Sequence, residues 1–164
     1  MKAASLLDDL NNLSGSIVAL DVRTGGVLAM TSHPSYDPNA FASGISPGLY
    51  TAWMNSPFRP LFDRSIQGQY PPGSTIKPLL ALAALENGHT SSKTVKCDGW
   101  FSLPRDSPRY RCWEKEGHGR VNLVEAIERS CDVFFYSLSN DIGINMIHSV
   151  LDRFGLGKVT GIDL

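Results

Sequence analysis

The residues best suited to chemistry are Ser74 and Lys77, which lie three positions apart. The preceding Pro-Pro-Gly at 71–73 cannot be helical, whereas residues 79–86 are strong helix formers, so we expect a helix from about Ser74 to a stop at residues 87–88. Residues three apart share a helix face, so the Lys77 amine can reach the Ser74 oxygen. The pair predicts an activated serine nucleophile, with N–H groups at the helix start facing an oxyanion.

This interpretation places a demand on Lys77. A lysine with its ordinary pKa of about 10.4 is protonated at neutral pH and cannot accept the serine proton. Desolvation against the apolar helix, or a neighbouring cation, must therefore lower the pKa of Lys77. Because serine and lysine are common, a chain of this length carries Ser-x-x-Lys by chance about once. The pair alone is a weak signal and depends on its context.

That context resembles a known family. Residues 64–78 are similar to the active-site signature of class B penicillin-binding proteins, the transpeptidases that cross-link peptidoglycan. The second motif of that family, Ser-x-Asn or Ser-x-Asp, is matched by Ser130-Cys131-Asp132. Aspartate in the third place resembles the elongation-type branch, penicillin-binding protein 2. Residues 15–30 and 154–164 are also similar to the family, so the resemblance covers nearly the whole chain.

The third family motif, Lys-Thr-Gly, does not occur. In the family it follows the Thr-Gly-Ile-Asp segment, here residues 160–163. We therefore expect residues 1–164 to be a partial transpeptidase domain, with a strand hairpin at about 15–33, a connector at 34–72 and a helical active-site part at 73–164. The chain alone is expected to be inactive.

Ser130 and Asp132 have a simpler interpretation and a functional one. From residue type alone, a Ser-Cys-Asp triplet between helical segments is a helix cap. By resemblance, Ser130 relays a proton to the departing amine, and Asp132 hydrogen-bonds Lys77 or the substrate amide. The resemblance implies a two-step acyl transfer in which Ser74 attacks a terminal D-Ala-D-Ala and β-lactams stall the acyl-enzyme.

Three rival functions remain open. A serine β-lactamase would need an added deacylating base, and no residue marks one. A β-lactam sensor domain shares Ser-x-x-Lys and differs in its flanking regions. A structural fragment without chemistry is the third possibility. Hydrolysis of a chromogenic cephalosporin distinguishes the first of these from a transpeptidase.

A second cluster of chemistry-bearing residues surrounds the long polar stretch 89–120. A loop of that length needs something to hold it in a compact domain. Three thiols and an imidazole form the ligand set of a closed structural zinc site, although no Cys-x-x-Cys pair is present. Some elongation-type relatives carry zinc here, often with aspartates in place of two cysteines. We expect structural zinc on four residues, with Asp98 in reserve: Cys97, Cys112, His118 and Cys131.

Two alternatives to zinc stay open. In an oxidising periplasm Cys97 and Cys112 could form a disulfide, with Cys131 a buried packing thiol and His118 a turn residue. The three thiols could also stay unlinked. Catalysis needs no cofactor in any of these cases.

Composition sets the remaining limits. The net charge is −1 and no basic block occurs, so neither nucleic acid nor an anionic membrane surface is implied as a partner. The sequence contains no run of eighteen apolar residues, which is the length that a membrane-spanning helix needs. The resemblance implies an inner-membrane protein with a periplasmic catalytic domain, of which this chain is a soluble fragment. It also implies three binding partners: stem peptides, β-lactams, and an elongation-complex glycosyltransferase bound through regions outside this chain.

The elements expected from the sequence are an amphipathic helix at 5–13, strands at 16–22 and 27–32, and a helix at 47–55. After the Ser74 helix and an unpatterned stretch at 89–120, helices are expected at 122–129, 131–142 and 144–154. The fold class is α+β. It resembles the penicillin-binding protein and serine β-lactamase fold, truncated to antiparallel strands and a helical subdomain.

Overall fold

The computed structural model describes residues 13–103 and 108–162. The chain forms two compact units, Met1–Tyr70 with Ile162–Leu164 and Pro71–Gly161, and each unit is described by itself. The helix expected at 5–13 lies outside the described residues, apart from Leu13. No helix in the described part is long and apolar enough to cross a membrane.

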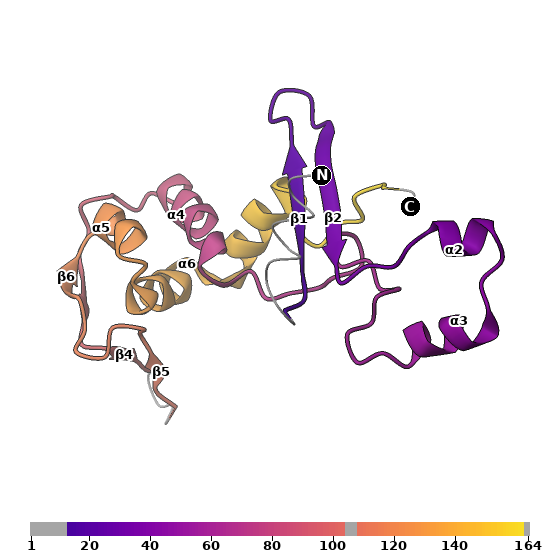
Figure 1. The fold of residues 1–164 in the computed structure, drawn as a ribbon. Helices are drawn as coiled ribbons and strands as arrows, with labels where there is room; N and C mark the ends of the chain where they lie inside the picture. Colours follow the sequence, from indigo (N-terminus) through magenta and orange to yellow (C-terminus); the bar gives the residue numbers. More distant parts are fainter. Residues whose placement is uncertain (1–12, 104–107, 163–164) are drawn as a thin grey trace. The chain divides into compact units, whose positions relative to one another are not determined.

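The first unit contains the expected hairpin (Figure 1). Strand β1 (Gly15–Leu20) pairs antiparallel with β2 (Val27–His33), in a register running from Gly15 opposite His33 to Leu20 opposite Val27. The first strand ends earlier than residue 22 because the Asp21 carbonyl accepts the N–H groups of Thr24 and Gly25 in a tight turn. Gly25 has a φ of 73°, which glycine adopts without strain.

Two helices follow in the connector. Helix α3 (Pro47–Met54) matches the expected helix at 47–55: the Ser46 side chain accepts the Leu49 N–H, and Pro47 occupies the first turn. Helix α2 (Asn39–Ala42) was not expected from the sequence. The rings of Tyr36 and Phe41 pack on Trp53, so aromatic contacts join the two helices.

Three α-helices form the core of the second unit: α4 (Lys77–Glu86), α5 (Leu123–Glu128) and α6 (Asp132–Arg153). The helix expected to begin at Ser74 begins at Lys77 and follows a 3-10 turn, η1 (Gly73–Ile76). Gly143, with φ 75° and ψ 164°, interrupts α6 at the break expected between 142 and 144. The core side chains come mainly from these helices, and the most deeply buried are Ala83, Ala84, Cys97, Val121, Ala126, Cys131 and Val150.

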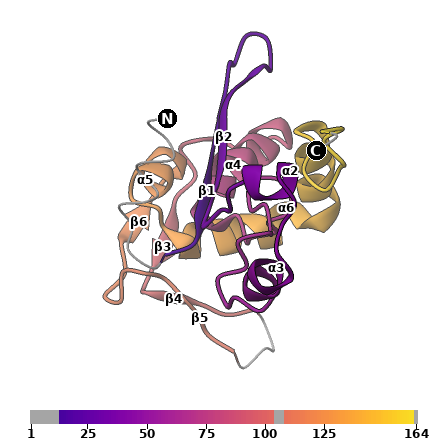
Figure 2. The ribbon, with the colours of Figure 1, turned by 45° about the vertical axis from the view of Figure 1, so that its right-hand side comes forward.

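The expectation of an unpatterned stretch at 89–120 is wrong. The structure places four short strands in and beside it: β3 (Val95–Cys97), β4 (Trp100–Phe101), β5 (Tyr110–Arg111) and β6 (Gly119–Val121) (Figure 2). β3 pairs with β6 and β4 with β5, both antiparallel. Strands of two or three residues are too short to show an alternating pattern. The combination of helices and antiparallel strands confirms the α+β class.

Candidate active site

Lys77 is the centre of a polar cluster in the second unit. It is the first residue of α4 and only 7% exposed. Its Nζ donates to Asp132 Oδ1 at 2.6 Å, to the Ser130 carbonyl at 2.8 Å and to Ser130 Oγ at 3.0 Å. The burial expected for this lysine is therefore present, but its charged neighbour is a carboxylate and not a cation.

Ser74 lies on η1 with its side chain exposed. Its Oγ accepts a hydrogen bond from Ser130 Oγ at 3.1 Å. The helix spacing predicted a direct contact between Lys77 and Ser74, but within the described ranges no hydrogen bond joins these two side chains. Ser130 instead lies between them, and its Oγ is hydrogen-bonded both to Ser74 Oγ and to Lys77 Nζ. The hydroxyl pair and the amine thus form a continuous hydrogen-bonded path.

The backbone around Ser130 aims these groups. Helix α5 begins with a reciprocal capping box between Asn122 and Glu125, and the chain leaves its end through Ser130, whose φ is 51°. A non-glycine residue with positive φ is uncommon and strained. The helix-cap interpretation of the triplet is not what the structure shows, since Cys131 is the N-cap of α6 and makes no side-chain capping bond.

Trp113 is a site residue that the sequence did not indicate. Its backbone N–H donates to Asp132 Oδ2 at 3.1 Å, and its indole Nε1 donates to the Arg129 carbonyl at 3.1 Å. The indole ring is also edge-on to His118, with centroids 5.2 Å apart. Only its place between Cys112 and His118 could have drawn attention to it. Trp113 therefore joins the active-site carboxylate to the cysteine cluster.

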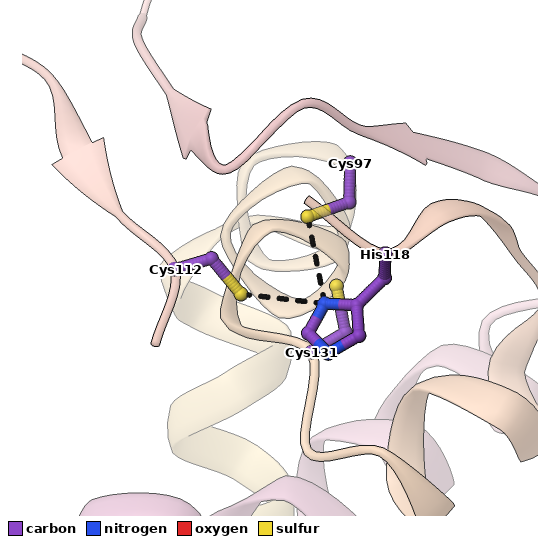
Figure 3. Close-up of side chains that lie close together, drawn as sticks. All are labelled: Cys97, Cys112, His118 and Cys131. Carbon is purple, nitrogen blue, oxygen red and sulfur yellow. Dashed lines mark hydrogen bonds between the residues drawn. The ribbon is translucent and has the colours of Figure 1, made fainter. Parts of the chain in front are cut away.

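The four expected metal ligands lie close together (Figure 3). Cys97 ends β3, Cys112 follows β5, His118 precedes β6 and Cys131 precedes α6. All four are buried, and their ligand atoms lie within 4.8 Å of one another. His118 Nδ1 faces the sulfurs of Cys97 at 3.6 Å and Cys112 at 3.5 Å. The reserve ligand Asp98 instead pairs with Lys96 on the surface.

The donor set fits a tetrahedral zinc ion. Sulfur ligands of zinc lie about 3.8 Å apart when each Zn–S bond is about 2.3 Å, so small inward shifts from the present spacing suffice. The three thiols are unlinked. Burial raises the pKa of Cys131 to about 12, with the neighbouring cysteines adding to the effect. Burial also opposes ionisation of Cys112, but backbone N–H groups of residues 114, 133 and 132 lower its pKa overall.

The chain was compared with known proteins. Residues 15–164 match the family described as the penicillin binding protein transpeptidase domain. The chain is 49% identical over 156 residues to the peptidoglycan D,D-transpeptidase MrdA of Escherichia coli (strain K12), covering 93% of this chain and 25% of that protein. It thus spans about a quarter of the length of this relative.

Solved structures agree with the sequence match. PBP2 of Pseudomonas aeruginosa superposes with a TM-score of 0.89 at 44% identity, covering 99% of this chain and 37% of that one. PBP2 of Helicobacter pylori, solved in complex with MreC, gives a TM-score of 0.85 at 32% identity, covering 96% of this chain and 29% of that one. The chain therefore belongs to the transpeptidase-domain family of the penicillin-binding proteins, on its elongation-type, class B branch.

Proposed function

We propose that these residues are the N-terminal part of the transpeptidase domain of a peptidoglycan D,D-transpeptidase, which cross-links stem peptides during cell elongation. The observation that carries the proposal is the hydrogen-bonded path from Ser74 through Ser130 to Lys77, which Asp132 anchors. On this interpretation residues 1–164 form a strand hairpin, a connector and a helical active-site part. The Lys-Thr-Gly strand lies outside them.

Ser74 Oγ would attack the carbonyl carbon of the penultimate D-alanine. With the two hydroxyl groups rotated so that Ser74 donates to Ser130 and Ser130 donates to the uncharged Lys77 amine, the Ser74 proton would pass to the Ser130 oxygen as the Ser130 proton passes to Lys77. A proton then passes from Lys77 through Ser130 to the nitrogen of the leaving group, which releases D-alanine and completes the acyl-enzyme. An amine of a neighbouring stem peptide then attacks the ester, which forms the cross-link and restores the Ser74 hydroxyl. Asp132 holds the amine in line throughout.

A β-lactam test examines this proposal directly. A complete transpeptidase domain containing these residues is incubated with benzylpenicillin, and the adduct is located by peptide mass spectrometry. We expect the adduct on Ser74 and its loss in Ser74→Ala. Ser92→Ala, an exposed serine outside the cluster, is the matched control and should label normally. An adduct that persists in Ser74→Ala would remove Ser74 as nucleophile.

The same reagents examine the rival functions. Steady hydrolysis of a chromogenic cephalosporin would indicate a β-lactamase, and single acylation without transfer to an added amine would indicate a sensor. We expect neither result. The 164 residues expressed alone should label far more slowly than the complete domain, because the missing strand supplies an oxyanion donor and the grip on the substrate carboxylate.

We also propose that the cluster of Cys97, Cys112, His118 and Cys131 holds a structural zinc ion. Its protein ligands would fill all four positions, so the metal takes no part in the chemistry. Its effect would be mechanical, because Cys131 lies between Ser130 and Asp132, and Cys112 precedes the Trp113 that binds Asp132. A metal would therefore hold two chain segments in place: the one that carries Asp132 and the one whose Trp113 N–H binds the Asp132 carboxylate.

Elemental analysis of the purified chain tests the zinc proposal. We expect one zinc per chain, three cysteines that react with a thiol reagent only after chelation, and the thiolate-to-metal absorption of tetrahedral Co²⁺ after exchange. Cys97→Ser should weaken metal retention, whereas Asp98→Asn, beside it but paired with Lys96, should not. Absence of metal with a single free thiol would favour the disulfide between Cys97 and Cys112.

Cell location and partners complete the proposal. We infer an inner-membrane protein whose catalytic domain lies in the periplasm and which works with an elongation-complex glycosyltransferase through regions outside this chain. Two solved structures of similar proteins support assembly with other proteins: the Helicobacter pylori relative in complex with MreC, and a peptidoglycan synthase complex that coordinates polymerization and crosslinking. Cell fractionation and affinity purification of the full-length protein test this. Recovery in the cytosol without such partners would contradict it.

A further inference from the structure

A pocket outside the Ser74 cluster lies between the side chains of Trp113 and Lys115. Its volume is about 170 Å³, and Gly99 and Cys112 line it together with three cations and two indoles: Arg109, Arg111, Lys115, Trp100 and Trp113. No acidic side chain lines it among the described residues. Nothing in the acyl-transfer scheme uses these cations, so the pocket needs an explanation of its own.

The local backbone brings the cations together. Arg111 lies opposite Trp100 across the pairing of β4 and β5, and the Arg109 guanidinium stacks 4.2 Å from the centroid of the Trp100 ring. Gly99, with a φ of 83°, lets residue 115 approach so closely that a Cβ at 99 would lie 2.1 Å from the Lys115 carbonyl oxygen. A hydrogen bond from the Cys112 N–H to the Gly99 carbonyl, at 2.9 Å, also holds the segment after β5 beside Gly99.

Three of the nearby acids make contacts outside the pocket. Asp98 pairs with Lys96 at 3.0 Å, and a Glu114 carboxylate oxygen accepts the Glu116 N–H. Asp132 is held by Lys77 and Trp113. Across residues 13–103 and 108–162, neither Arg111 nor Lys115 makes an ion pair. Arg111 and Lys115 therefore have no carboxylate partner among the described residues, while the Glu114 and Glu116 carboxylates beside Lys115 in the sequence offset part of the positive charge.

We propose that this pocket binds a carboxylate carried by the stem peptide, away from the bond that Ser74 attacks. The proposal rests on the proposed transpeptidase function. Guanidinium groups match the planar geometry of a carboxylate, and the two indoles offer apolar faces to the peptide around it. Trp113 connects the pocket with the active site, since its backbone N–H holds the carboxylate that binds Lys77.

A matched pair of synthetic pentapeptides isolates the charge. Both end in D-Ala-D-Ala and carry a γ-linked D-glutamate in the second position, with its α-carboxylate free in one and amidated in the other. Binding to the Ser74→Ala form of the complete transpeptidase domain is followed by NMR titration at low salt. We expect the free acid to bind about tenfold more tightly than the amide, and the difference to shrink at high salt.

Variants place the effect in the pocket. Arg111→Gln and Lys115→Gln should each remove most of the preference for the acid, whereas Lys158→Gln, an exposed lysine of the same unit, should retain it. Equal affinity for the two peptides would overturn the proposal. Displacement of the peptide by millimolar inorganic phosphate would also overturn it, as would tighter binding of an oligonucleotide, since these results define a general anion site or a nucleic-acid site.

The outcome is separable from that of the proposed function. Penicillin labelling of Ser74 in the complete domain uses a different reagent and a different readout. Labelling without any preference between the peptides would leave the transpeptidase proposal standing and remove the pocket. A charge-dependent preference without labelling would leave the pocket and remove the nucleophile.

Discussion

Asp132 binds through both of its oxygens, one to the Lys77 amine and one to the Trp113 backbone. A carboxylate fixed on two sides has little freedom to rotate, so it sets the position of the amine beside Ser130. Its role is therefore positional, and shape at this residue should matter as well as charge.

Replacement of Asp132 tests that role. Asn keeps one oxygen for Lys77 but presents an amide nitrogen to the Trp113 N–H, whereas Ala removes both acceptors. We expect Asp132→Asn to slow penicillin acylation of the complete domain by less than about tenfold and Asp132→Ala by about a hundredfold or more. Stopped-flow acylation rates measure both. Equal rates for the two variants would contradict the positional role.

Cys131 makes the stability of the metal-free chain depend on pH. Burial raises its pKa from 9.0 to about 12. Between these values the unfolded thiol has lost its proton and the folded thiol has kept it, so the free energy of unfolding falls as pH rises through this window. Below about pH 9 this contribution is constant.

The change is measurable by urea unfolding of the chelator-treated chain at pH 8 to 11. We expect the wild type to lose up to about 1.4 kcal/mol more per pH unit than Cys131→Ala above pH 9. The cavity left by alanine shifts both ends of the profile equally and does not alter the slope. Parallel profiles would show that the thiol ionises equally in both states.

Residue type and spacing indicated Ser74 and Lys77, and the family resemblance added Ser130 and Asp132, but neither indicated how these residues connect. Ser74, Lys77, Ser130 and Asp132 lie together, as do the four predicted metal ligands, although the catalytic and metal roles stay proposals. The passage through Ser130 could not be predicted, because Ser130 lies 53 positions after Lys77 in the sequence and no local spacing records such a contact. Trp113 acts largely through its backbone N–H, which every residue except proline has, so its type gave no signal.

Among the elements, α5 is the shortest helix that positions the site. With only six residues it has few internal hydrogen bonds, so its reciprocal capping box between Asn122 and Glu125 carries a large share of its stability. The chain leaves this helix directly into Ser130. Unfolding at the end of α5 would therefore displace Ser130 from its position beside Ser74 and Lys77.

Asn122→Ala should lower the free energy of unfolding by about 1 kcal/mol, because it removes the acceptor of the Glu125 N–H. Asn140→Ala, at an exposed position on α6, is the control and should change it little. Urea unfolding followed by circular dichroism measures both variants. A change at 122 no larger than that at 140 would show that the capping box contributes nothing.

Elements with strong local signals were predicted well. Pro47 after Ser46 marked the start of α3, and Gly143 marked the interruption of α6. The strands β3 to β6 were missed because partners distant in sequence create them. Val95 pairs with Val121, and no local pattern records such a contact.

At the scale of the whole chain, the two units differ in how they are stabilised. The second unit holds the buried core and the cysteine cluster. The first unit is built on a two-stranded sheet with apolar side chains exposed along it, among them Val18, Leu20, Val27 and Leu28. A hairpin without further strands is marginally stable in water. The α+β class was predicted from the sequence, but the difference in stability between the two units was not.

Hydrogen exchange should show the difference. In the isolated chain we expect amides of β1 and β2 to exchange at least about tenfold faster than those of α4 and the first half of α6. Chelation should accelerate exchange around Cys97 and Cys131 and leave the hairpin unchanged, so that the hairpin is an internal control. Uniform protection of both units would contradict this account.

The left-handed backbone at Ser130 also restricts how such a protein can evolve under antibiotic pressure. Glycine, asparagine and aspartate adopt this conformation most easily, yet none of them offers an alcohol. Threonine offers one, but its branched β-carbon is poorly suited to the same dihedral angles. On the proposed function, few replacements at this position satisfy both demands, so we expect substitutions that lower β-lactam acylation to be found at other positions.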